Sequence, residues 1–315
     1  MNDFMSWFYQ AYGLNIYSEI SCPFVNGNAD QAIDVEIKLG QVPSHLQKPE
    51  YIAPWYAISN HELLLKFPTI ANFYIESGER ITIQIEHQNL THVMVYLLGS
   101  AMCGLLLQRG LMILHANTVM VDNQGILIMA PPGTGKSTLT AAFLKKGFLL
   151  ISDDLSALSI QNQQALAYPG YPQIKLCPDV FNYFDYTPQQ LQQLPFEIRK
   201  IIKYYVRVPE QYHPEPCKIT QLILLETTDT QQISGHELIQ GYTKFKTLLN
   251  HAHFSLIYKT QKMEHRYFNQ CAALSTLIPL QRLVRPRDQF SAFDLVDEIV
   301  AQTRNTKCQP ISLTQ

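Results

Sequence analysis

Hydrophobic and polar positions along the chain separate two regions with different patterns. Up to about residue 92, short runs alternate between apolar and polar residues, as in Val35–Leu39 and Ile81–Ile85, and Pro and Gly interrupt them. Such alternation predicts strands with one buried face. Residues 1–92 are therefore expected to form a small β-rich domain.

The pattern changes after residue 92. The most apolar run, Val93–Leu107, predicts a buried helix, and Gly110 follows it where a helix C-terminus favours glycine. The run is shorter than the ~20 residues that span a bilayer, and Gly99 and Gly104 interrupt it, so no membrane association is expected. The next segment, Leu111–Val121, is strand-like.

The rest of the chain alternates apolar strand-like runs with helix-like segments, which is typical of an α/β domain. Residues 93–315 are predicted to form this second domain. Strands are expected at Ile126–Ala130, Phe148–Ser152, Leu222–Leu225 and Phe254–Tyr258, and helices at Ser137–Lys146, Arg199–Tyr205, Met263–Leu277 and Ser291–Thr303.

Composition narrows the classes of function. The formal net charge is -2, so the basic surface of a nucleic-acid-binding protein is not indicated. The six cysteines lie far apart without a Cys-x-x-Cys pair, which favours reduced thiols over zinc sites or disulfides. Residues 1–7 lack the basic segment of a secretory signal. These features together favour a cytoplasmic protein.

A segment between a predicted strand and a predicted helix has the spacing of a phosphate-binding loop. Residues 130–137 read Ala-Pro-Pro-Gly-Thr-Gly-Lys-Ser, with Ala130 where the first Gly usually stands. The two glycines let backbone N–H groups approach phosphate oxygens. Lys136 would meet the β- and γ-phosphates, and the Ser137 hydroxyl would bind Mg²⁺. The predicted residues for ATP and Mg²⁺ are Ala130, Pro131, Pro132, Gly133, Thr134, Gly135, Lys136, Ser137 and Thr138.

Two adjacent aspartates, Asp153 and Asp154, follow the strand after this loop. One helix, one turn and one strand separate them from Lys136, so they are expected at the sheet edge that holds the loop. One carboxylate can bind Mg²⁺, together with Ser137, and the other can accept the proton of an attacking hydroxyl. Asp154 is predicted as the metal ligand, although the sequence does not decide which aspartate binds the metal and which accepts the proton. A surface turn is the alternative interpretation of the pair.

These motifs together resemble the C-terminal kinase domain of HPr kinase/phosphorylase. The resemblance lies in Leu-His-Ala-Asn-Thr-Val at residues 114–119, the loop, Lys-Gly at 146–147, and Ile-Ser-Asp-Asp at 151–154. Phosphoenolpyruvate carboxykinases share this nucleotide-binding core more distantly. The resemblance implies a P-loop α/β kinase core of this type, with catalytic roles for His115, Lys136, Asp153 and Asp154.

Two further segments, Tyr168–Asp179 and Val284–Asp288, resemble a divergent branch of HPr-kinase-like serine kinases that includes lasso-peptide tailoring kinases. The glycine- and basic-rich phosphorylase loop is not recognised. The resemblance implies an ATP- and Mg²⁺-dependent kinase acting on Ser or Thr of a peptide or small protein, and it is compatible with a homo-oligomer. The alternatives are a small-molecule kinase, a phosphoenolpyruvate-carboxykinase-like enzyme, and a nucleotide-binding regulatory protein.

Weaker signals lie elsewhere in the chain. Lys175 is a candidate contact for substrate or phosphate, and a solvated loop lysine is the equal alternative. Arg285 and Arg287 are interpreted as an exposed basic turn in preference to a phosphate contact. His251 and His253 are interpreted as a strand edge in preference to a metal site.

Overall fold

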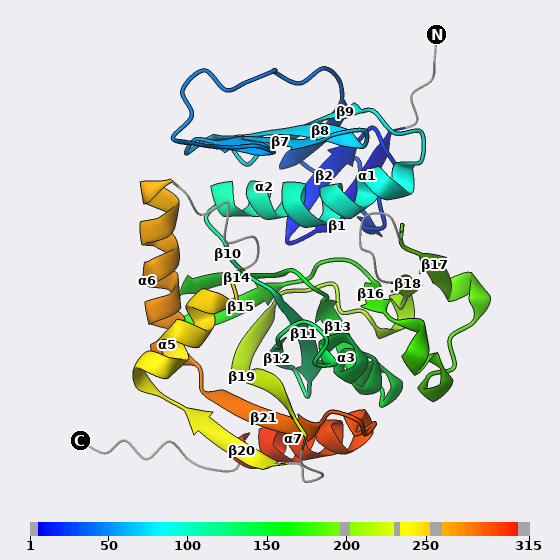
Figure 1. Cartoon of the computed structure of the whole chain (residues 1–315), viewed down its shortest axis with the longest axis vertical. Helices are drawn as coiled ribbons and strands as arrows, with labels where there is room; N and C mark the ends of the chain where they lie inside the picture. Colours follow the sequence, from blue (N-terminus) through cyan, green and yellow to red (C-terminus); the bar gives the residue numbers. More distant parts are fainter. Residues whose placement is uncertain (1–5, 196–201, 230–233, 253–259, 308–315) are drawn as a thin grey trace.

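The computed structural model describes residues 6–195, 202–229, 234–252 and 260–307. It shows a mixed α/β fold with two nine-stranded sheets and one three-stranded sheet (Figure 1). The first large sheet is built from the N-terminal region, and the second from residues after 110.

The N-terminal sheet has the strand order β3-β1-β2-β4-β9-β8-β7-β6-β5. The alternating runs at Val35–Leu39 and Ile81–Ile85 lie in β4 and β9. In these strands Val35, Ile37, Ile81 and Ile83 are buried and the residues between them are half-buried, so the strand predictions are confirmed. The strands are β1 (Trp7–Ala11), β2 (Leu14–Ser18), β3 (Val25–Asn26), β4 (Val35–Leu39), β5 (Tyr51–Ala53), β6 (Tyr56–Ile58), β7 (Glu62–Phe67), β8 (Ala71–Glu76) and β9 (Arg80–Ile85).

One long helix lies between the two large sheets (Figure 1). It consists of α1 (Leu90–Tyr96), a π-helical segment (Leu97–Ala101) and α2 (Met102–Gln108). A Cβ atom at Gly104 would lie 2.3 Å from Leu63 Cδ2, so glycine allows α2 to approach β7 closely. This is the one helix among the described residues with the length and hydropathy of a membrane span, and 67% of its most apolar window is buried. The prediction of a buried helix is confirmed.

The hydrophobic core is continuous between the two regions of the chain. Ile37 of the first sheet, Leu105 of the helix and Leu158 of the second sheet belong to one buried cluster. The domain boundary at residues 92 and 93 therefore stays a prediction.

Five strands of the second sheet position the candidate site, in the order β13-β11-β12-β19-β21. β11 is antiparallel to both β12 and β13, whereas β12, β19 and β21 are parallel to one another. The carboxyl ends of β12, β13, β19 and β21 therefore meet at the edge where β11 begins. These strands are β11 (Ala116–Val121), β12 (Gln124–Met129), β13 (Leu149–Ser152), β19 (Cys217–Thr228) and β21 (Leu280–Pro286).

The hairpin between β11 and β12 turns through two residues, Asp122 and Asn123. Both have positive φ, 48° and 63°, as a two-residue type I′ turn requires. Val121 pairs with Gln124 next to the turn, and Ala116 pairs with Met129 at the other end of the hairpin. The turn thus sets the register of the strands that lead to the loop.

The remaining elements surround this sheet. α3 (Lys136–Lys145) and α7 (Ala292–Lys307) contact each other and share a second buried cluster. α5 (Gly241–Asn250) and α6 (Gln261–Leu277) pack against each other, and α6 contacts β14 and β15. The other strands are β10 (Met112–Leu114), β14 (Ser156–Gln161), β15 (Gln164–Tyr168), β20 (Ser234–Ile239) and, in the small sheet, β16 (Gln173–Leu176), β17 (Leu191–Gln193) and β18 (Tyr204–Arg207).

Most of the predicted elements in the second region are present, with two corrections. The predicted strand Leu111–Val121 breaks at His115, because β10 pairs with β14 whereas β11 pairs with β12 and β13. The helix predicted over Arg199–Tyr205 is wrong at its C-terminal end, where β18 pairs with β16 and β17 and buries Tyr205. Residues 199–201 and the predicted strand Phe254–Tyr258 lie outside the described residues.

Candidate active site

The segment at residues 130–137 has the predicted strand–loop–helix context. β12 ends at Met129, the loop follows, and α3 begins at Lys136. Gly133 and Gly135 have φ values of 81° and 99°, a region that glycine enters without steric cost. The Thr134 hydroxyl donates to the Pro131 carbonyl over 2.8 Å. This hydrogen bond closes the loop into a tight turn. Because α3 begins directly after the loop, the first N–H groups of the helix have no intrahelical partners and point towards the loop.

The loop residues differ in exposure. Pro131, Pro132 and Gly133 are exposed, whereas Ser137 and Thr138 are half-buried in the first turn of α3. Ala130 and Thr134 are buried. The exposed part of the loop is thus its first half, and the Ser137 hydroxyl lies at the start of the helix.

The sheet topology brings His115, Lys136 and the two aspartates to one edge. The loop follows β12, Asp153 and Asp154 follow β13, and His115 directly precedes β11, which lies between them. Because β11 is antiparallel to its neighbours, its beginning lies beside their carboxyl ends.

Asn117 connects these parts and was not among the predicted site residues. Its side chain is fully buried. The Oδ1 atom accepts hydrogen bonds from Lys136 Nζ at 2.7 Å and from the Asp154 backbone N–H at 2.8 Å. The Nδ2 atom donates to Thr140 Oγ1 at 2.8 Å. A polar Asn in an otherwise apolar strand was the available signal, because a buried amide needs partners.

Asp154 lies among groups that carry or can carry positive charge. Its backbone has a φ of 68°, and the hydrogen bond from its N–H to Asn117 supports this left-handed conformation. Its carboxylate accepts from Lys175 Nζ at 2.6 Å and lies 3.3 Å from His115 Nδ1 and 3.8 Å from Lys136 Nζ. The side chain keeps 24% of its exposure, so a cation can reach it.

Asp153 is more deeply buried than Asp154. Its Oδ2 atom accepts the Lys175 backbone N–H at 2.9 Å, and its buried Oδ1 atom has no hydrogen-bond partner. Burial outweighs the nearby Lys136 charge and raises the pKa of Asp153 to about 6. A carboxylate with such a pKa can accept a proton near neutral pH.

Burial is the main cause of the pKa shifts of His115 and Lys136. Burial and the charge of Lys136 lower the pKa of His115 to about 4, so the imidazole is neutral at pH 7. Burial also lowers the pKa of Lys136. Lys175 is buried in β16 and does not lie in a solvated loop. Its contact with a substrate stays a prediction.

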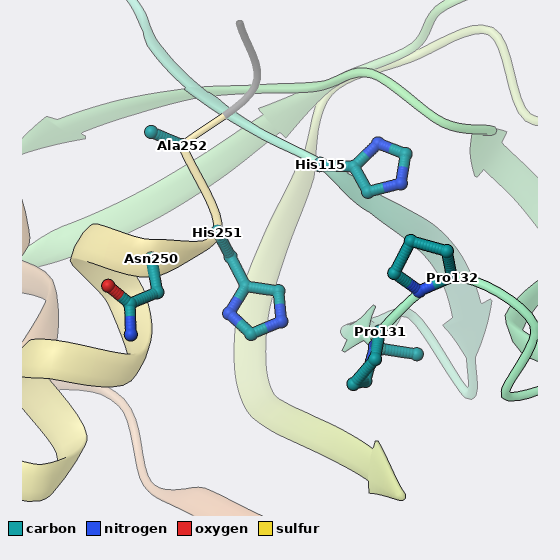
Figure 2. A pocket seen from close by; sticks show the side chains of 7 residues that line it. His115, Pro131, Pro132, Asn250, His251 and Ala252 are labelled. Atoms are coloured by element: carbon teal, nitrogen blue, oxygen red, sulfur yellow. The ribbon is translucent and has the colours of Figure 1, made fainter. Parts of the chain in front are cut away.

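A pocket of about 450 Å³ adjoins the first half of the loop. Figure 2 shows the His115 and His251 rings and the two loop prolines around it. The backbone N–H of His115 donates to the His251 carbonyl at 2.8 Å, and burial lowers the pKa of His251. His251 ends α5 and does not lie in a strand, although Ala252 bridges to Leu114. The lining residues are His115, Ala130, Pro131, Pro132, Asn250, His251 and Ala252.

The site residues fit Mg²⁺ bound together with phosphate oxygens. Within the described ranges, no group of three or more His, Cys, Asp or Glu side chains could hold a metal on its own, and His253 lies outside those ranges. Mg²⁺ needs only one or two carboxylates when phosphates supply further ligands. Ser137 and the partly exposed carboxylate of Asp154 are donors of this kind.

The raised pKa of Asp153 leads to a prediction about stability. The pKa is about 6 in the folded chain and about 3.9 in an unfolded one. The stability that protonated Asp153 contributes is complete below about pH 4 and is lost as the pH rises through 6. Asp153→Asn removes the charge, so we expect the variant to be more stable than the wild type at pH 8, by on the order of 1–2 kcal/mol.

Thermal unfolding of both proteins in EDTA, at several pH values between about 4 and 8, measures this difference. The difference should shrink towards pH 4, where the carboxyl is protonated in the folded wild type and about half protonated in the unfolded chain. Asp179→Asn is the matched control, because Asp179 is exposed. A difference that does not change with pH would contradict the prediction.

No protein-family model and no curated protein matches the chain. Among solved structures, the chain is similar to the Hpr(Ser) kinase/phosphatase from Coxiella burnetii, with 16% sequence identity and a TM-score of 0.33. The match covers 62% of this chain and 97% of that chain.

Proposed function

We propose that this chain is an ATP- and Mg²⁺-dependent kinase that transfers the γ-phosphoryl group to a Ser or Thr hydroxyl of a peptide or small protein. The observation that carries the proposal is the meeting of a Lys-Ser loop at a helix N-terminus with two aspartates and a neutral histidine at one sheet edge. Phosphoryl transfer requires groups that bind the phosphates, hold Mg²⁺ and accept the proton of the nucleophile, and these residues are of the types that do so.

The proposed nucleotide site uses the loop and the start of α3. Backbone N–H groups and the helix N-terminus attract phosphate. Lys136 Nζ would exchange its bond to Asn117 for phosphate oxygens. Ser137 and Asp154 would hold Mg²⁺, which neutralises phosphate charge when bound. Lys175 contacts Asp154 and would add positive charge beside the transferred group.

Asp153 is the proposed proton acceptor. The hydroxyl oxygen of the acceptor attacks the γ-phosphorus and its proton passes to Asp153, while the bond to the β–γ bridging oxygen breaks and ADP leaves. The raised pKa of Asp153 and its unpartnered Oδ1 support this role. His115 positions Asp154 through Nδ1 and stays neutral.

The pocket beside the loop supports a peptide acceptor. None of the described residues that line it is Lys or Arg, and both imidazoles have lowered pKa values. A charged metabolite would need convergent cationic groups to replace its hydration. An uncharged pocket that opens beside the loop fits a Ser or Thr with its neighbouring residues.

The product of the reaction tests the proposal. The purified chain is incubated with γ-labelled ATP, Mg²⁺ and either a peptide library or the products of neighbouring genes, and the labelled molecule is identified by mass spectrometry. We expect acid-stable phosphoserine or phosphothreonine, and labelling at least about 10²-fold slower with Asp153→Asn. Acid-labile label would indicate phosphohistidine or an acyl phosphate. Label on a small organic acid only, or CO₂-dependent turnover, would favour the small-molecule alternatives.

A further inference from the structure

Arg285 lies at the same sheet edge as the candidate site. It is near the carboxyl end of β21, which runs parallel to β19 and, through it, to β12. The sequence predicted an exposed basic turn for Arg285 and Arg287. This is correct for Arg287, which is exposed and pairs with Asp229 at 3.0 Å, but wrong for Arg285, which is half-buried. The parallel arrangement of β12, β19 and β21 therefore places Arg285 near the loop that follows β12.

The guanidinium of Arg285 lies against the second half of the loop. Its Nε atom donates to the Thr134 carbonyl at 2.7 Å, and Nη1 donates to the Pro286 carbonyl at 2.9 Å. Its Nη2 atom lies 3.1 Å from the position that a Cβ atom of Gly135 would occupy. The guanidinium thus covers Gly135, where the loop passes into α3.

The charge of this group is not balanced by an acid in the described part of the chain. Its recorded acceptors are the backbone carbonyls of Thr134, Pro286, Arg287 and Gln289, and no carboxylate forms an ion pair with it there. A half-buried cation without a counter-ion is costly unless an anion joins it. Burial and the neighbouring Arg287 lower its pKa, which agrees with this imbalance.

We propose that Arg285 is a nucleotide-binding residue that anchors the loop through Nε and binds a phosphate oxygen through Nη2. The inference rests on the proposed function, because it requires a phosphate at the loop. A guanidinium has several N–H donors in a fixed plane, so it can donate to a backbone carbonyl and to a phosphate oxygen at the same time.

The position of Arg285 indicates which phosphates it binds. The uncharged pocket touches the loop at residues 130–132, whereas Arg285 touches it at Thr134 and Gly135. The acceptor therefore enters at one end of the loop, and Arg285 holds the nucleotide at the other. Arg285 thus contacts phosphates that remain in ADP after transfer.

The test measures the Kd values of Mg²⁺-ADP and of a non-hydrolysable ATP analogue by calorimetry at low and high salt. Arg285→Gln keeps a donor for the Thr134 carbonyl but lacks the charge. We expect it to weaken both nucleotides about 10- to 100-fold and to reduce the salt dependence of binding. Arg285→Lys keeps the charge and should lose less. The matched control is Arg287→Gln, which should bind as the wild type does.

Three results in the variants would overturn the inference. Unchanged affinity in Arg285→Gln would exclude a phosphate contact. Equal losses in the Gln and Lys variants, with wild-type salt dependence, would assign Arg285 to loop anchoring alone. A loss for the ATP analogue without a loss for ADP would place the residue at the γ-phosphate. If the wild type binds neither nucleotide, the proposed function fails together with the inference. Thermal unfolding of each variant checks that the fold is retained.

Discussion

Asp153→Asn is expected to lower the rate of phosphoryl transfer about 10²- to 10⁴-fold, the usual effect of losing a general base. The amide keeps the shape of the carboxyl and can still accept the Lys175 backbone N–H, but it cannot take up the proton of the attacking hydroxyl. Single-turnover transfer with a saturating acceptor measures the rate, and calorimetry should give near-wild-type affinity for Mg²⁺-nucleotide.

Asp154→Asn is the matched variant at the neighbouring position. Since Asp154 is the proposed Mg²⁺ ligand, this variant should lose the dependence of nucleotide affinity on Mg²⁺, whereas Asp153→Asn should retain it. Full transfer rates in both variants would show that the pair is structural. A reversed pattern would exchange the two roles and leave the reaction type unchanged.

Lys136→Ala should weaken nucleotide binding by at least about 100-fold. The substitution removes the cation proposed to meet the β- and γ-phosphates, and hydrogen bonds between charged groups contribute more than neutral ones. Lys136 is buried beside Asp154, so the variant also leaves that carboxylate with less positive charge nearby. Calorimetry with Mg²⁺ and an ATP analogue measures the loss.

The control for this prediction lies at the other end of the same helix. Lys145 is exposed and pairs with Asp185, so Lys145→Ala removes the same charge from α3 without touching the loop. Equal affinities in Lys136→Ala and in the wild type would refute the assignment of residues 130–137 as a phosphate-binding loop.

The parts of the site that lie close together in the chain were predictable. The loop and Asp153-Asp154 are separated only by α3, one turn and β13, so strand direction alone places them at one edge. The alternation in Val35–Leu39 was similarly local. Hydrophobic patterning depends on neighbouring residues, and these elements need no information about distant partners.

The parts contributed by distant segments were not predictable. The break at His115 arises because β10 and β11 pair with different strands, and no local residue signals it. Arg285 reaches Thr134 across 151 positions of the chain. Asn117 looked like one polar residue in an apolar strand, and its three partners come from segments that only the folded sheet brings together.

The Asp122–Asn123 turn lies at the far end of the hairpin from the loop, about 20 Å along β11 at the usual rise per strand residue. A shift of one residue in pairing moves every side chain of a strand to the opposite face. An insertion in this turn that shifted the pairing of β11 by one residue would turn Asn117 away from Lys136 and Asp154 without altering any residue of the site. The length of this surface turn therefore constrains the geometry of a site at the other end of the hairpin, and its two positive φ angles also restrict which residues can form it.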